Sequence, residues 1–154
     1  MTLPTRPPAR RHAAALTATI FLCTAAAVVQ TAEANAPIRV STSNRVPACV
    51  TPERLMTFLK TKNDALDPRF RDIAKHYKAH GERLGVRWDY AFYQMILETG
   101  ALSFKGDVKA SQNNFAGLGA TGKGERGESF ADVSTGVRAH LEHLMLYAGE
   151  PLDN

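Results

Sequence analysis

Glu98 is the residue whose type and position most clearly predict chemistry. It stands near the end of the run Trp88–Gly100, WDYAFYQMILETG, which is apolar on almost every side, as in a helix buried in a core. Gly100 is a typical C-terminal stop. A carboxylate in the last turn faces the negative end of the helix dipole, and burial adds a desolvation cost. Both effects favour the protonated acid that general acid catalysis requires. The alternative is a Glu that emerges into water at the helix end.

A long glycine-rich stretch follows this helix, between Ala101 and Ser129. Its glycine density excludes a regular helix and predicts loops or a small hairpin. Loops of this length in a compact domain usually carry function. We therefore expect this stretch to face the acid at the helix end.

Three further helices are predicted from capping signals and apolar spacing. They begin at Thr51-Pro52, Asp67-Pro68 and Ser134-Thr135, and glycines end the last two at Gly85 and Gly149. The sequence shows no alternation of strands and helices and no internal repeat. These elements predict a mainly α domain.

Histidine pairs occur on two of the predicted helices. His76 and His80 lie four residues apart, but the H-E-x-x-H arrangement of a zinc site is absent, so a solvated helical face is predicted. His140 and His143 are interpreted as surface or satisfied polar residues. No metal site and no cofactor is predicted.

The first 36 residues have the layout of a secretory signal peptide. Arg6, Arg10 and Arg11 precede the apolar stretch Ala13–Val29, and small-x-small cleavage sites follow within Ala32–Ala36. The alternative, an uncleaved membrane anchor, needs a longer and more apolar stretch. We therefore expect an exported protein, periplasmic or extracellular, with no stable membrane span after signal removal.

The remaining chain is expected to contain a linker, residues 37–50, and one small domain, residues 51–154. The removed segment carries three Arg and one Glu, so the net charge falls from +4 to about +2. This charge does not indicate nucleic-acid binding. Cys49 is then the single cysteine, which excludes an intramolecular disulfide. No oligomeric state follows from the sequence.

Three blocks, in order, resemble the glucosaminidase domain of bacterial peptidoglycan hydrolases. They are Gln94–Gly100 (QMILETG), Gln112–Leu118 (QNNFAGL) and Ser129–Val137 (SFADVSTGV). In glycoside hydrolase family 73 and in flagellar peptidoglycan hydrolases, a helix ends in a Q-x-x-x-E-[ST]-G block. An N-N-x-x-G-[IL] loop follows, and a F-x-x-[YV]-x-S segment leads into another helix. The resemblance covers roughly residues 50–149.

The resemblance implies a lysozyme-like helical domain with a Gly-rich loop or small hairpin lobe. It implies a hydrolase that cleaves the β-1,4 bond next to N-acetylglucosamine in peptidoglycan, with Glu98 as general acid. Gln94, one helical turn earlier, would orient Glu98 or bind a sugar amide, with helix packing as the alternative. Asn113 and Asn114 would bind N-acetyl and hydroxyl groups, although turn formation is the alternative and is expected for Asn114. Phe115 would line the cleft floor, with a place in the core as the alternative.

Glycoside hydrolysis normally uses two carboxylates. The second acid of the family falls in the glycine-rich stretch, where Glu128 matches better than Glu125, and Asp107 is a third candidate. With no second acid, the N-acetyl group of the substrate would act as nucleophile. Retention or inversion at the anomeric carbon is therefore left open.

Two other functions remain open from the sequence. A lytic transglycosylase shares the fold and needs one acid, and a non-catalytic cell-wall-binding module needs none. Some domains of the superfamily are labelled amidases, but no zinc or Cys-His arrangement supports amide cleavage here. Family members continue beyond the last helix, whereas this chain stops at Pro151–Asn154, so we expect a fragment or a truncated member.

Overall fold

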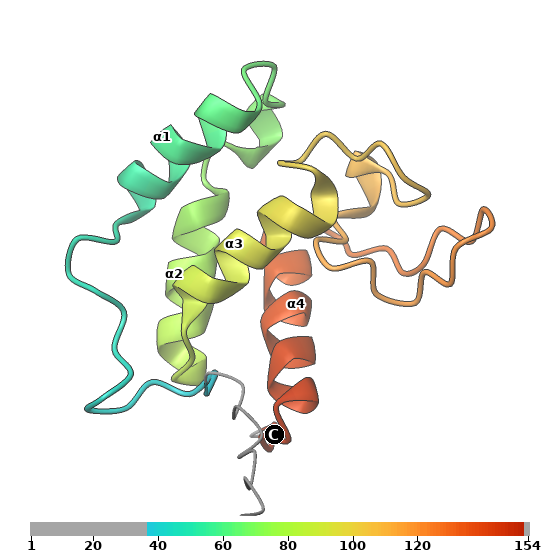
Figure 1. The fold of residues 1–154 in the computed structure, drawn as a ribbon. Helices are drawn as coiled ribbons and strands as arrows, with labels where there is room; N and C mark the ends of the chain where they lie inside the picture. The colour runs from blue at the N-terminus through green and yellow to red at the C-terminus, as the bar shows by residue number, and fades with distance from the viewer. Residues whose placement is uncertain (1–36, 153–154) are drawn as a thin grey trace, which may run out of the picture. The chain divides into compact units, whose positions relative to one another are not determined.

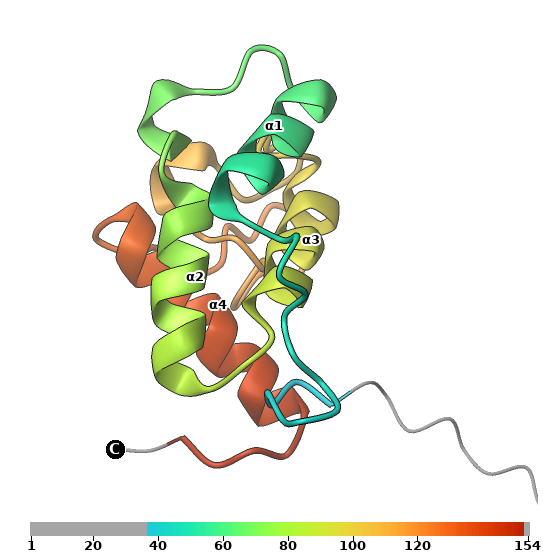
Figure 2. The same cartoon turned by 90° about the vertical axis from the view of Figure 1, so that its left-hand side faces the viewer.

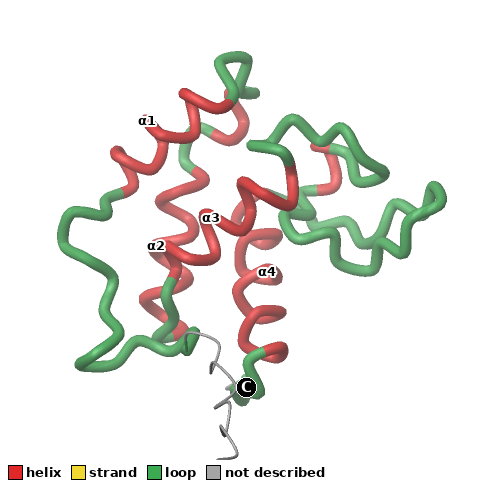
Figure 3. Tube along the Cα trace, in the orientation of Figure 1, coloured by secondary structure: helices red, strands yellow, loops and turns green. Residues whose placement is uncertain are grey.

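The computed structural model describes residues 37–152, and its elements are all helical (Figure 1). In order they are α1 (Pro52–Lys62), the 3-10 turn η1 (Pro68–Phe70), α2 (Ile73–Leu84), α3 (Trp88–Thr99), the 3-10 turn η2 (Ala110–Gln112) and α4 (Val133–Tyr147). The described residues contain two isolated β-bridges but no strand (Figure 3). The predicted mainly α fold is confirmed. The signal peptide predicted for residues 1–36 lies outside the described residues.

Helix α2 contacts each of the other three long helices and anchors the core. In Figure 1, α3 crosses in front of α2 and α4, and Figure 2 shows α2 lying against α4. Tyr77 of α2, Phe92 of α3 and Leu141 of α4 are fully buried at this junction. Gly81 allows the close approach of Trp88, because a Cβ atom at Gly81 would clash with Cβ of Trp88. None of the helices within residues 37–152 combines the length and the apolar character that a membrane span requires.

The predicted helix from Asp67 to Gly85 is wrong at its start, because the structure divides it. Asp67 Oδ1 accepts a hydrogen bond from the Arg69 N–H at 2.9 Å and caps only the short turn η1. This turn buries Phe70, and α2 then begins at Ile73. Gly85 ends α2 in the left-handed conformation, as predicted.

The last helix differs slightly from its prediction at both ends. The carboxylate of Asp132 accepts a hydrogen bond from the Thr135 N–H at 2.7 Å, so Asp132 is the N-cap and α4 begins at Val133. The helix ends at Tyr147, two residues before Gly149.

Part of the predicted linker belongs to the fold. Ile38 is buried, and Arg39 pairs with Val86 in an antiparallel bridge. The Arg87 N–H donates to the Ile38 carbonyl at 2.7 Å, and the Val40 N–H donates to Gly85 at 2.9 Å. These backbone bonds fix the chain beside the start of α3.

Candidate active site

Glu98 lies in the last turn of α3, and its side chain is exposed, so its predicted burial is wrong. The helix buries one face through Ala91, Phe92 and Met95 but exposes apolar residues elsewhere, including Leu97 at 81 %. Because the run Trp88–Gly100 is almost continuously apolar, the sequence did not reveal that one face of α3 is exposed to solvent. This face places the carboxyl group of Glu98 in contact with solvent and with two cavities.

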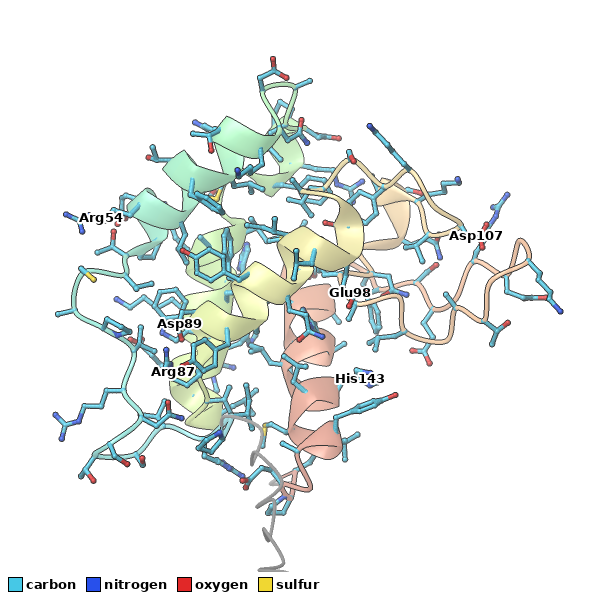
Figure 4. The ribbon with its side chains drawn as sticks, in the orientation of Figure 1. Arg54, Arg87, Asp89, Glu98, Asp107 and His143 are labelled. Atoms are coloured by element: carbon cyan, nitrogen blue, oxygen red, sulfur yellow. The ribbon has the colours of Figure 1, made fainter. Side chains whose placement is uncertain are left out.

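The first cavity, of about 380 Å³, lies between the end of α3 and the glycine-rich loops. Its lining includes Glu98, Ser103, Phe104, Lys105, Asp107 and Asn114. Figure 4 shows Glu98 at the C-terminal end of α3, between the loop that carries Asp107 and His143 on α4. The carboxyl group of Glu98 thus shares a space with a second carboxylate.

The wall of this cavity is built by a left-handed turn after α3. Gly100, Ala101 and Leu102 have φ values of 57°, 56° and 62°. Such values are costly for residues other than glycine and persist where the surroundings enforce them. The Asn63 amide donates to the Ala101 carbonyl at 2.9 Å, and the Phe104 N–H donates to the Thr99 carbonyl at 3.0 Å. The turn directs Ser103 and Phe104 along the cavity beside Glu98.

The three candidates for a second carboxylate occupy different places. Asp107 lines the first cavity, and its Oδ2 accepts a hydrogen bond from the Gly124 N–H at 3.3 Å. Glu128 and Glu125 are exposed on the loop, and neither lines a cavity that Glu98 lines. The backbone of Glu128 instead pairs with that of Leu118. Asp107, the third candidate from the sequence, is therefore the loop carboxylate that shares a cavity with Glu98.

The second cavity, of about 720 Å³, extends from Glu98 between α3 and α4. Gln94 lines it together with Glu98, which agrees with the prediction that both side chains share one face of the helix. The remaining lining includes Tyr90, His143 and Tyr147. The sequence did not identify Tyr90 or Tyr147 as site residues, because single tyrosines on a helix carry no motif.

Asn113 and Asn114 are buried, and their side chains hold the loop together. Asn113 Oδ1 accepts a hydrogen bond from Arg69 at 2.6 Å, and its amide donates to the Phe130 carbonyl at 2.8 Å. Asn114 exchanges hydrogen bonds with the backbone of Leu118, both at 2.9 Å. The structural role expected for Asn114 is confirmed, although this residue also lines the first cavity.

Phe115 is fully buried, so the prediction that it lines the cleft floor is wrong. Its ring packs edge-on against Phe70, with centroids 5.9 Å apart, and lies tilted against Phe104, with centroids 6.4 Å apart. Phe104 lines the first cavity and is only partly buried. The exposed aromatic face is therefore that of Phe104, which the left-handed turn brings over the buried ring of Phe115.

His80 and His140 are less exposed than residues on a solvated helical face. His140 is fully buried with its Nδ1 2.7 Å from the Tyr77 hydroxyl, and its Nε2 has no partner among the described residues. Burial, with a smaller effect of nearby His143, lowers the pKa of His140 to about 4. His80 Nε2 lies 2.8 Å from Ser134 Oγ.

The described residues contain no group of three or more His, Cys, Asp or Glu placed to hold a metal ion.

Comparison with known proteins agrees with the resemblance read from the sequence. The family model "Mannosyl-glycoprotein endo-beta-N-acetylglucosaminidase" matches residues 74–153, just over half of the chain. An uncharacterized protein of Borreliella burgdorferi is 39 % identical over 99 residues, which are 64 % of this chain and 48 % of the relative. The chain thus spans about half the length of that relative, and no solved structure matches it. The chain belongs to the glucosaminidase family.

Proposed function

We propose that this protein is an exported peptidoglycan hydrolase that cleaves the glycan β-1,4 bond next to N-acetylglucosamine, with Glu98 as general acid. Family membership supports glycoside hydrolysis of peptidoglycan as the reaction class. The N-terminal signal pattern supports export. The choice of the cleaved bond and of the general acid depends on the position of Glu98.

The observation that carries this proposal is that Glu98 lines both cavities. A polymer that crosses Glu98 would place sugars in the cavity beside the loops and in the cavity between α3 and α4. The glycosidic bond between two such sugars would then lie against the carboxyl group. An acid at the junction of two sugar-sized depressions suits an enzyme that cleaves within a chain.

Catalysis would proceed by protonation of the glycosidic oxygen. The carboxyl group of Glu98 donates its proton to this oxygen as the bond to the anomeric carbon breaks. Water adds to the anomeric carbon and gives its proton to a base. Asp107, which lines the same cavity, is available as that base or as the nucleophile. Gln94, one turn before Glu98, is placed to bind an amide of the same sugar.

A lytic transglycosylase is the second candidate, and the location of Glu128 favours it. Glu128 is the residue that the family resemblance favoured as the second acid. It lines neither cavity and therefore lies outside the site. In a transglycosylase the hydroxymethyl oxygen of the muramyl residue attacks its own anomeric carbon, so one acid is sufficient. The product then carries an anhydro end in place of a reducing end.

Digestion of purified peptidoglycan, followed by mass spectrometry of the products, separates these reactions. Reducing N-acetylglucosamine ends are expected and would establish the glucosaminidase. Anhydro-muropeptides would show that the protein is a lytic transglycosylase instead. If the folded protein binds peptidoglycan but releases no product, it is a cell-wall-binding module and the proposed activity is wrong.

A further inference from the structure

The cavity between α3 and α4 presents aromatic side chains from two helices. Tyr90 on α3 is 41 % exposed, Tyr147 on α4 is 81 % exposed, and both line this cavity. A tyrosine combines a flat apolar face with a polar tip. The axial C–H groups of a pyranose ring pack on such a face, while its hydroxyl groups point toward water and polar atoms.

The ring of Tyr90 is held in place by a buried ion pair. Arg87 places its guanidinium carbon 3.7 Å from the centroid of the Tyr90 ring. The same guanidinium donates to both carboxylate oxygens of Asp89, at 2.8 and 2.6 Å, and to Asn44 Oδ1 at 2.6 Å. The side chains of Arg87 and Asp89 are 7 % and 5 % exposed, near the start of α3 (Figure 4). A ring fixed in this way loses little conformational entropy when a ligand packs on it.

The opposite wall of the cavity is also aromatic. His143 and Tyr147 lie four residues apart on α4, with ring centroids 4.5 Å apart and ring planes inclined by 59°. This spacing places both rings on one face of the helix. A sugar between α3 and α4 would therefore meet aromatic side chains on both sides.

The charge of the lining restricts which sugar fits. Among residues 37–152, no Lys or Arg lines this cavity, and Glu98 is the only carboxylate in its lining. The cavity on the other side of Glu98 includes Lys105 in its lining, together with Asp107. Carboxylates of a peptide stem would therefore meet the negative charge of Glu98 between α3 and α4 with no Lys or Arg in the lining to compensate it. A neutral sugar without a peptide meets no such penalty.

We propose that Tyr90, with Tyr147 opposite, forms a binding subsite for a neutral N-acetylhexosamine unit of the glycan, and that the buried Arg87–Asp89 pair positions Tyr90. The subsite rests on the proposed function, because it assumes that a glycan crosses Glu98. It deepens that function by assigning the unsubstituted sugar to the cavity between α3 and α4. Arg87 and Asp89 act through Tyr90 and are positioning residues.

The test uses the full chain with Glu98→Gln, so that binding is measured without cleavage, and the tetramer of N-acetylglucosamine as probe. In calorimetric titrations, Tyr90→Ala is expected to weaken binding by about tenfold, and Tyr90→Phe, which keeps the ring, by less than about twofold. Tyr147→Ala is also expected to weaken binding. Because Tyr147 is 81 % exposed, its removal leaves the core intact.

Tyr93→Ala is the matched control, since Tyr93 is on the same helix and is 42 % exposed but lies against Phe58, outside this cavity. It is expected to leave the dissociation constant unchanged. Absence of binding by the Glu98→Gln chain, or equal effects of Tyr90→Ala and Tyr93→Ala, would overturn the subsite. Tyr90-dependent binding in a protein that never cleaves peptidoglycan would instead support the subsite and reject the proposed activity.

Discussion

Thr99 Oγ1 accepts a hydrogen bond from the backbone N–H of Leu102 at 2.8 Å and donates one to the Met95 carbonyl at 2.7 Å. This single hydroxyl joins the last turn of α3 to the left-handed turn that follows it. Thr99 is buried and directly follows Glu98 in the chain. Thr99, the second residue of the E-T-G block, therefore fixes the geometry beside the acid.

Replacement of Thr99 by Val is expected to lower the free energy of unfolding by about 1–3 kcal/mol, because it leaves the buried Leu102 N–H without an acceptor. Chemical denaturation measures this change. Thr99→Ser retains the hydroxyl and should lose less stability than Thr99→Val. If both variants lose the same amount, the hydrogen bond does not hold the turn.

The stability of the protein should depend on the protonation of His140. Its pKa is lowered by burial to about 4 in the folded protein, while the unfolded chain binds this proton near pH 6.5. Between these values the unfolded state binds more protons, so the free energy of unfolding falls as pH falls from about 6.5 to 4. Above about pH 6.5, His140 is neutral in both states and no longer changes the free energy of unfolding. Between about pH 6.5 and 4, the free energy of unfolding falls by on the order of 3 kcal/mol.

Denaturant titrations at several pH values, with His140→Met and His143→Gln, test this prediction. His140→Met should remove most of the change in the free energy of unfolding with pH. A smaller dependence on pH is expected to remain, because burial also lowers the pKa of His80. His143→Gln should keep a slope close to that of the unmodified protein. A slope that persists unchanged in His140→Met would show that another group carries the dependence.

The carboxylate that assists Glu98 is expected to be Asp107. Because Asp107 lines the cavity that Glu98 lines, Asp107→Asn should lower kcat/KM for peptidoglycan by about 100-fold. Glu128→Gln is expected to change it by less than about threefold, since Glu128 lies outside both cavities. Steady-state turbidity assays give both values. A larger loss of kcat/KM in Glu128→Gln than in Asp107→Asn would instead identify Glu128 as the second catalytic carboxylate, as the family resemblance suggested.

The helices could be predicted from the sequence because their signals are local. The bounds of α3 match the predicted Trp88–Thr99, and Gly100 ends it in the left-handed conformation as expected. Thr51 caps α1 through a hydrogen bond from the Arg54 N–H. The Asp67-Pro68 signal was also local, but burial of Phe70 in a 3-10 turn moved the start of α2 to Ile73.

The surroundings of the site could not be predicted because they depend on contacts between distant residues. The sequence of α3 does not reveal that Leu97 and Glu98 are exposed, since this depends on where α2 and α4 pack. The burial of Phe115 likewise follows from its contacts with Phe70. Gly100 signals the end of α3, but the continuation of the left-handed turn through Ala101 and Leu102 carries no glycine signal, so its role in shaping the cavity emerges only in the structure.

Glu98→Gln tests the central claim most directly. The exposed carboxyl group contributes little to folding, so the variant should retain the circular dichroism spectrum and melting temperature of the unmodified protein. Its release of soluble fragments from purified peptidoglycan should fall by at least about 100-fold. Glu125→Gln, an exposed loop acid outside both cavities, is the matched control and should remain active. Undiminished release of fragments by a folded Glu98→Gln protein would contradict the assignment of Glu98 as the general acid.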